Sequence, residues 1–122
     1  MAKIPLVFVV DDEGTIATTT AVILNHNGYE AFAFTQPQNA LQAAEARCPD
    51  FLVTDVSMRA MDGIDLCIQF KELYPTCKVL LFSGALATGP LLESACRKGF
   101  EFTILAKPVY PDDLLENLTR LR

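Results

Sequence analysis

The chain has 122 residues, of which 51% are hydrophobic and 20% are charged, and its net charge of −5 accompanies an isoelectric point near 4.7. This length and composition predict a single compact domain over residues 1–122. The acidic balance argues against direct binding to nucleic acid or to an anionic membrane. The longest apolar runs, 6–10 and 79–82, are far shorter than the roughly 20 residues of a membrane helix. Since the N-terminus also lacks a signal-peptide core, the sequence predicts a cytoplasmic protein.

The cysteines and the single histidine are spaced too widely to form a zinc site or a dithiol pair. We interpret the cysteines as reduced, mostly packed thiols: Cys48, Cys67, Cys77 and Cys96. His26 lies in the segment Asn-His-Asn-Gly, where helical spacing ends, and is interpreted as a solvent-facing residue at a helix terminus.

Apolar runs and helical spacing alternate five times along the chain. The five expected strands are the segments 6–10, 29–34, 51–55, 79–82 and 102–106. The five expected helices run from residue 15 to Asn27, from the capping residue Thr35 through Ala44, from Leu66 to Leu73, from Thr88 to Gly99 and from Pro111 to Leu121. This alternation predicts an α/β fold in which one parallel sheet carries helices on both faces, joined by right-handed crossovers. Alternation alone leaves the order of the strands open.

Acidic, hydroxyl and cationic side chains follow four of the expected strands. Asp11 and Asp12 follow the first strand, and Asp55 ends the third. Ser83 follows the fourth strand, and Lys107 follows the fifth. Because the carboxyl ends of parallel strands share one edge of the sheet, where such folds bind ligands, we expect these side chains to lie together.

Three neighbouring carboxylates repel one another, so they either take up protons or recruit a cation. A hard divalent ion such as Mg²⁺ prefers carboxylate, carbonyl and water oxygens and commonly shares its shell with phosphate. A carboxylate can also act as a nucleophile toward phosphorus. A nearby lysine and hydroxyl would then bind the transferred phosphoryl group.

Four separated motifs resemble the receiver domain of two-component response regulators, the CheY-like family. In chain order they are Val9-Val10-Asp11-Asp12-Glu13, Asp55 with Met58 and Met61-Asp62-Gly63, Ser83-Gly84-Ala85, and Lys107-Pro108. The resemblance covers essentially the whole chain. It implies a flavodoxin-like, doubly wound sheet of five parallel strands in the order 2-1-3-4-5 with five helices. It also implies that residues 1–122 are one receiver domain, with no output domain in this chain.

The resemblance implies that Asp55 is the phosphoacceptor. The implied ligands of Mg²⁺ are Asp11, Asp12, Asp55 and the backbone carbonyl of Ser57. The phosphoryl group would be bound by Ser83 and by Lys107. The resemblance also implies a cis peptide bond between Lys107 and Pro108.

The sequence departs from the family pattern in three places. The segment from Gly99 to Lys107 is one residue longer than is typical, and the other two departures concern the loop after the acceptor and the switch. Arg59 stands where a proline commonly shapes the loop after the acceptor, and we expect Ser57, Arg59 and Ala85 to modulate the site. The aromatic residue that usually couples the site to the output face should lie three residues before the lysine, where Ile104 stands. Phe102, two residues away on the same strand face, is a candidate substitute.

The implied function is that of a phosphorelay signalling domain in the cytoplasm. A sensor histidine kinase or a histidine phosphotransfer protein would phosphorylate Asp55. The face built by helix 4, strand 5 and helix 5 would then bind a downstream protein, without nucleic acid or membrane. The protein would not be an enzyme beyond self-phosphorylation and autodephosphorylation. The alternatives are a receiver fold that binds proteins independently of phosphorylation, and a phosphohydrolase, which Ser57 disfavours because a second acid would be expected there.

Overall fold

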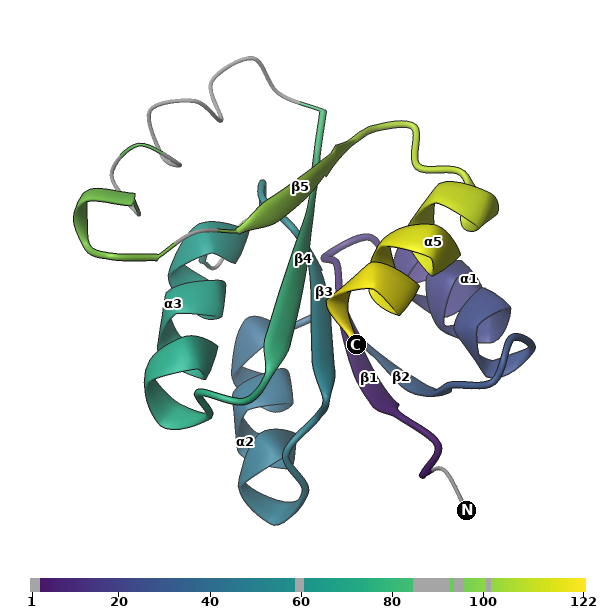
Figure 1. Ribbon diagram of the computed structural model, residues 1–122, viewed down its shortest axis with the longest axis horizontal. Helices are drawn as coiled ribbons and strands as arrows, with labels where there is room; N and C mark the ends of the chain where they lie inside the picture. The colour runs from purple at the N-terminus through teal and green to yellow at the C-terminus, as the bar shows by residue number, and fades with distance from the viewer. Residues whose placement is uncertain (1–2, 59–60, 85–92, 94–95, 101) are drawn as a thin grey trace.

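The computed structural model, which describes residues 3–58, 61–84, 93, 96–100 and 102–122, contains five parallel strands between layers of helices (Figure 1). The strands are β1 (Leu6–Val10), β2 (Glu30–Phe34), β3 (Phe51–Asp55), β4 (Lys78–Ser83) and β5 (Thr103–Ala106). Four helices lie within the described residues: α1 (Gly14–Asn25), α2 (Pro37–Ala46), α3 (Gly63–Leu73) and α5 (Pro111–Leu121). Most of the predicted helix between residues 88 and 99 lies outside the described residues.

The strands pair in the order β2-β1-β3-β4-β5, and every pairing is parallel. This order confirms the flavodoxin-like fold. In the centre of the sheet, Val9 of β1 is in register with Ala33 of β2 on one side and with Val53 of β3 on the other. Because β1 and β3 are neighbours, the residues that follow β1 lie beside the end of β3.

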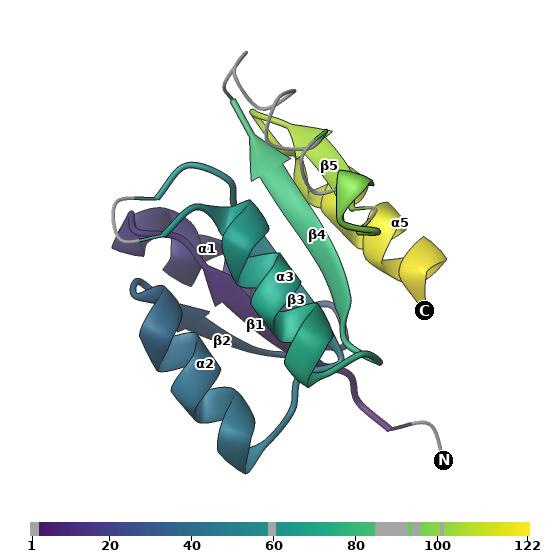
Figure 2. The ribbon, with the colours of Figure 1, turned by 90° about the vertical axis from the view of Figure 1, so that its left-hand side faces the viewer.

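Helices α2 and α3 cover one face of the sheet, and α1 and α5 cover the other (Figures 1 and 2). Successive side chains of a strand point to opposite faces, so β1 contributes to two cores. Leu6, Phe8 and Val10 pack toward α2 and α3, whereas Val7 and Val9 pack toward α1 and α5. Every residue of β1 and of β3 is buried, as their continuous apolar character predicted.

Predictions about the start of several elements were wrong. α3 begins at Gly63 and not at Leu66, because the side chain of Asp62 caps the helix by accepting the N–H of Asp65, and β5 begins at Thr103, one residue later than expected. Thr35 was expected to cap α2, but the chain stays extended for one more residue, and Gln36 takes the cap position without a side-chain hydrogen bond. Pro37 fixes the backbone of the first turn instead. Tyr29 was assigned to β2, but the strand begins one residue later. The N–H of Tyr29 donates to the carbonyl of Leu24 and so belongs to the turn after α1.

The cysteines are all free, but only half of them are packed. Cys67 and Cys77 are buried, whereas Cys48 and Cys96 are exposed, so the prediction of mostly packed thiols was only partly right. His26 is exposed and forms the C-cap of α1, as its sequence context predicted.

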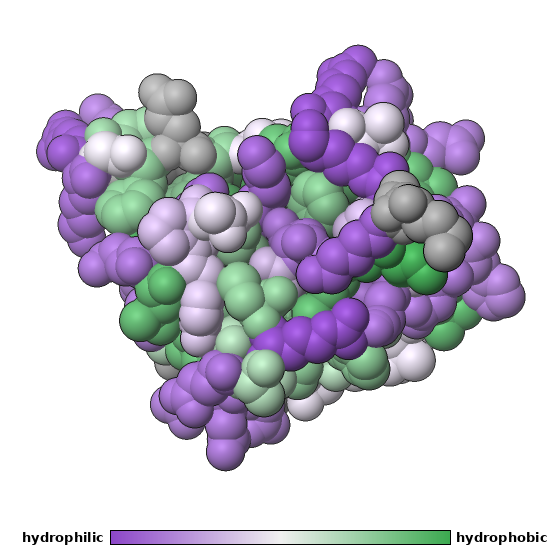
Figure 3. All heavy atoms as spheres, turned by 60° about the horizontal axis from the view of Figure 1, so that its bottom comes forward, coloured by the Kyte–Doolittle hydropathy of each residue, from purple (hydrophilic) through white to green (hydrophobic). Residues whose placement is uncertain are grey.

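The surface around the amino-terminal ends of the strands interleaves hydrophilic and hydrophobic residues (Figure 3). Among the described residues, the large apolar side chains that are exposed belong to different elements: Ile4, Val22, Phe32, Leu73 and Tyr110. Scattered apolar residues of this kind are ordinary on protein surfaces. Within the described ranges, none of the helices has the length and apolarity that crossing a membrane requires.

Candidate functional site

The acids predicted at the strand ends come together at the carboxyl-terminal edge of the sheet. β1 ends at Val10, so Asp11 and Asp12 begin the loop that leads to α1, while Asp55 is the last residue of β3. One carboxylate oxygen from each of the three acids lies within 4.8 Å of the others. The adjacency of β1 and β3 produces this cluster, because it places two strand ends side by side.

Asp11 and Asp55 are both buried. Asp11 is the more deeply buried, with 2% of its surface exposed, whereas Asp55 has 7% of its surface exposed. Its Oδ1 accepts the backbone N–H of Glu13 at 2.9 Å, whereas its Oδ2 has no hydrogen-bond partner in the described part of the chain. Burial raises the pKa of Asp11; the Glu13 N–H and Lys107 oppose this, while the charges of Asp55 and Asp12 add to it. A buried carboxylate oxygen without a partner is costly, so this atom is suited to a cationic ligand.

Lys107 supplies positive charge to the acids. Its Nζ lies 2.9 Å from Oδ2 of Asp55, and its side chain is 32% exposed. Burial by itself would lower the pKa of Lys107. The hydrogen bond to Asp55 and the charges of Asp55, Asp11 and Glu13 outweigh that effect and raise the pKa. Lys107 is therefore held as an ammonium ion beside the predicted acceptor.

Glu13 is a contributor that the sequence analysis did not assign to the site. Its N–H binds Asp11, and its charge acts on Lys107. The signal available in the sequence was its place as the third acid in a row after β1.

Ser83 ends β4, next to the loop that carries Lys107. Its carbonyl accepts the backbone N–H of Lys107 at 2.9 Å, which joins the end of β4 to the segment after β5. The Lys107-Pro108 peptide is cis, as the family resemblance implied. The hydroxyl-bearing residue and the lysine thus lie at the same edge as the acids.

The first residues of the loop after Asp55 are held against the sheet by backbone N–H groups. Ser57 is exposed, and its N–H lies 3.4 Å from Oδ1 of Asp55. The preceding Val56 donates its N–H to the carbonyl of Phe82 at 2.9 Å. The predicted loop modulators Arg59 and Ala85 lie outside the described residues.

The two candidate switch residues of β5 and its approach share a face, as predicted. Phe102 and Ile104 are partly buried and both pack against the core on the α2 and α3 side. The ring of Phe102 also stacks with that of Phe100, with 6.1 Å between centroids. Phe100 was not assigned by the sequence analysis, because its contact with Phe102 depends on how the chain approaches β5.

A hollow of about 530 Å³ adjoins this site. Ile16 and Thr20 of α1 line one side, and Phe82, Lys107 and Val109 line the other. Its walls are mainly apolar apart from the lysine. Of the residues at the candidate site, only Lys107 lines this hollow; the carboxylates of Asp11, Asp12 and Asp55 are not part of its described lining.

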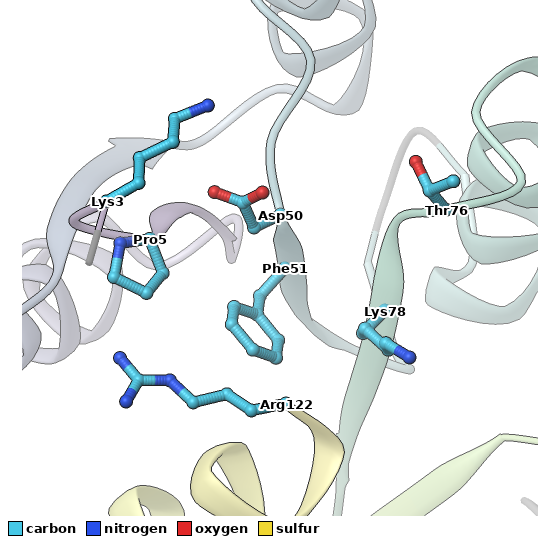
Figure 4. A pocket seen from close by; sticks show the side chains of 7 residues that line it. All are labelled: Lys3, Pro5, Asp50, Phe51, Thr76, Lys78 and Arg122. Carbon is cyan, nitrogen blue, oxygen red and sulfur yellow. The ribbon is translucent and has the colours of Figure 1, made fainter. Parts of the chain in front are cut away.

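A smaller hollow, of about 280 Å³, lies at the opposite edge of the sheet (Figure 4). Its acid is engaged, because Oδ2 of Asp50 accepts the N–H of Leu6 at 2.8 Å. The amino group of Lys78 points away from Arg122 in Figure 4, and the Arg122 guanidinium lies 4.9 Å from the ring centre of Tyr29. The charges around this hollow do not converge as those at the carboxyl edge do.

Comparison with known proteins agrees with this geometry. Residues 7–119 match the family model described as the response regulator receiver domain. The DNA-binding transcriptional regulator NtrC of Escherichia coli is 30% identical over 115 residues, which cover 94% of this chain and 24% of NtrC. The alkaline phosphatase synthesis regulator PhoP of Bacillus subtilis is 36% identical over 66 residues, which cover 54% of this chain and 28% of PhoP. The chain thus spans about a quarter of the length of these relatives.

Solved structures show the same fold. A response regulator receiver domain protein of Clostridium thermocellum superposes with a TM-score of 0.86 at 25% identity, covering 97% of this chain and 94% of that one. The chemotaxis protein CheY4 of Vibrio cholerae gives a TM-score of 0.86 at 24% identity, covering 98% of this chain and all of that one. Such similarity at low identity shows that the arrangement of strands and helices is shared.

Proposed function

The chain belongs to the response regulator receiver domain family, and on that premise we propose that Asp55 accepts a phosphoryl group from a phosphohistidine of a sensor kinase or of a phosphotransfer protein. The observation that carries the proposal is the 2.9 Å contact of Asp55 with Lys107 beside the carboxylates of Asp11 and Asp12. A nucleophilic carboxylate, a fixed cation and an oxygen-rich cluster are the parts that phosphoryl transfer requires.

The acidic cluster fits a divalent cation by two observations. One carboxylate oxygen of each acid lies within 4.8 Å of the others, and Oδ2 of Asp11 is buried without a partner among the described residues. Ligands that are all oxygen atoms suit Mg²⁺. We assign Asp11, Asp12 and Asp55 as its carboxylate ligands and the backbone carbonyl of Ser57 as a further one. When bound, Mg²⁺ would neutralise charge on the phosphoryl oxygens.

The proposed transfer forms one bond and breaks one. A carboxylate oxygen of Asp55 attacks phosphorus to give an acyl phosphate, and the P–N bond to the donor imidazole breaks with its electron pair left on nitrogen. Lys107 then pairs with a phosphoryl oxygen in addition to, or in place of, the carboxylate it now contacts. The hydroxyl of Ser83 donates to another phosphoryl oxygen. Positioning and charge neutralisation supply the catalysis, since phosphoryl transfer needs little covalent assistance.

The phosphorylated form would shift a two-state equilibrium of the face formed by the fourth helix, β5 and α5. In this proposal Ile104 and Phe102 carry the change along β5, and Ser57, Arg59 and Ala85 set its lifetime. A downstream protein, or a module such as those that relatives like NtrC contain beyond the matched region, would read the result. The protein acts as its own substrate and not as an enzyme on others, which agrees with the absence of a second acid at position 57.

The test is the mass of the intact protein after incubation with Mg²⁺ and acetyl phosphate. The wild type should gain one acid-labile phosphoryl group, about 80 Da by the chemistry of phosphorylation, and Asp55→Asn should not gain it. Asp112→Asn, which removes an exposed carboxylate from the first turn of α5, is the matched control and should behave as wild type. Absence of the adduct in the wild type, or its presence in Asp55→Asn, would contradict the proposal.

The phosphorylation-independent alternative is separated by a second measurement. Beryllofluoride, which mimics the acyl phosphate, should shift the amide resonances of β5 and α5 in the wild type but not in Asp55→Asn. Unchanged resonances in both proteins would favour a binding module without a switch.

A further inference from the structure

The peptide bond between Asp55 and Val56 is held at each of its polar atoms. The carbonyl oxygen of Asp55 accepts a hydrogen bond from the hydroxyl of Thr54 at 3.0 Å. The N–H of Val56 donates to the carbonyl of Phe82 in the neighbouring strand at 2.9 Å, and the carbonyl of Val56 accepts the N–H of Gly63 at 2.7 Å. The end of β3 is therefore tied to its own strand, to β4 and to the first residue of α3.

Thr54 reaches this carbonyl from inside the core. Only 1% of its surface is exposed, and its hydroxyl also lies 3.8 Å from the sulfur of Met58. A buried hydroxyl needs a good acceptor because water cannot reach it. The carbonyl of Asp55 is that acceptor, so burial of Thr54 fixes the orientation of the peptide that follows the acceptor residue.

Gly63 approaches the same peptide from outside the strand. A Cβ at this position would overlap the carbonyl oxygen of Asp55, and would lie 2.8 Å from its carbonyl carbon and 3.0 Å from Cα of Val56. All three are backbone atoms, so no side-chain rotation could relieve the contact. Gly63 is not one of the glycines with positive φ. Close approach, and not backbone conformation, is therefore what demands a glycine here.

We infer that Thr54 and Gly63 are positioning residues for the phosphoacceptor: by fixing the Asp55–Val56 peptide they set where the Asp55 carboxylate meets Lys107 and the other acids. Functional groups must be held to within a fraction of an ångström to act together, and they rely on their surroundings for this. A peptide that rotated to admit a Cβ at position 63 would turn the acceptor residue with it. The inference rests on the proposed function of Asp55.

Two variants test it, each with a matched control. Thr54→Val removes the hydroxyl while keeping the shape of the side chain, and Gly63→Ala adds the Cβ that the backbone leaves no room for. Thr119→Val removes a comparable hydroxyl-to-carbonyl hydrogen bond, of 2.9 Å, from the exposed face of α5. Gly14→Ala adds a Cβ that meets only a methyl group at 3.6 Å.

Three readouts are compared: amide hydrogen exchange of the metal-free protein, Mg²⁺ affinity by calorimetry, and phosphorylation rate at saturating Mg²⁺. In Thr54→Val, exchange at Val56 and Gly63 should become about fivefold faster, the factor for one hydrogen bond of ordinary net strength. Exchange of the Tyr74 amide, at the far end of α3, should stay unchanged. Mg²⁺ affinity and phosphorylation rate should each fall about fivefold, and further in Gly63→Ala, while both controls stay within about twofold of wild type.

Three outcomes would overturn the inference. In the first, the folded variants keep Mg²⁺ affinity and exchange at Val56 and Gly63 within twofold of wild type. In the second, exchange accelerates equally at Tyr74, which would indicate a loss of global stability only. If Gly63→Ala does not fold, Thr54→Val decides, since its shape is conserved, and normal exchange and affinity in that variant would count against the inference. A wild type that neither binds Mg²⁺ nor takes up phosphoryl would contradict the proposed function instead, while exchange at Val56 and Gly63 would still report whether Thr54 holds the peptide.

Discussion

Replacing Asp11 with asparagine should stabilise the metal-free protein and remove most of its response to Mg²⁺. Asparagine keeps an oxygen that can accept the N–H of Glu13, so the entry into α1 is preserved. What changes is the charge and the buried oxygen that lacks a partner. The substitution therefore isolates the cost of holding three carboxylates together without a metal ion.

The size of the effect follows from the distances in the cluster. Two unit charges separated by the 4.8 Å limit of the cluster repel by about 3 kcal/mol at an effective dielectric constant of about 20. Asp11 has two such neighbours, and the attraction of Lys107 offsets roughly one of them. We expect a net gain of about 1–3 kcal/mol, or about 4–12 °C in melting temperature for a chain of this size.

The gain should depend on pH in a defined direction. Because burial raises the pKa of Asp11 in the folded protein, the folded state binds this proton more tightly than the unfolded state. The contribution of Asp11 to the free energy of unfolding is therefore greatest at acid pH. It falls as the pH rises from the ordinary pKa of a carboxyl group through the raised pKa of Asp11. The advantage of Asp11→Asn should be small in acid, where Asp11 is protonated in both states, and full once it is ionised.

Thermal unfolding, monitored by circular dichroism in EDTA and in 10 mM Mg²⁺, measures the stability of the metal-free protein and its response to Mg²⁺. Mg²⁺ should raise the midpoint of the wild type, since a ligand stabilises the state that binds it, and should raise that of Asp11→Asn much less. Glu45→Gln, an exposed substitution on α2 with the same change of net charge, should match wild type in both buffers. The reasoning is refuted if Asp11→Asn is less stable than wild type in EDTA, or gains as much from Mg²⁺.

Three further predictions concern the rest of the fold. Phe70→Ala should lower the free energy of unfolding by about 3–5 kcal/mol in urea titrations, because this ring is fully buried between α3 and the sheet; a loss below about 1 kcal/mol would show that the core there is loosely packed. Burial raises the pKa of Cys77 to about 12, so iodoacetamide at pH 8 should alkylate the exposed Cys96 and spare Cys77 until urea unfolds the protein, as peptide mass spectrometry would reveal; equal labelling would disprove it. Arg47→Ala removes an exposed ion pair with Glu30 and should leave the melting temperature unchanged, because such pairs contribute little; a clear drop on calorimetry would contradict this.

Local sequence patterns were sufficient to predict the class of fold and to place the acids at the ends of strands. Continuous apolar character in residues 6–10 and 51–55 indicated strands covered on both faces, and burial of all of β1 and β3 bears this out. Periodicity is a local property of the chain, so it reports which residues face a core and where a strand stops. Hence Asp11 and Asp55 could be placed at strand ends without any knowledge of the tertiary structure. The cap at Thr35 failed for a related reason, since a single residue of extended chain is below what periodicity resolves.

The pairing of the strand ends, and the contacts between their side chains, follow from the folded arrangement and could not be read from local sequence. The order β2-β1-β3-β4-β5 depends on where each connecting helix returns the chain to the sheet. The alternation of strands and helices along the sequence is compatible with other orders. The 2.9 Å contact between Lys107 and Asp55 joins residues 52 apart in the sequence. Thr54 in the sequence is an ordinary β-branched strand residue, and the contact of Gly63 with Asp55 exists only because α3 begins against the end of β3. Such contacts depend on packing summed over distant segments, which a local pattern does not encode.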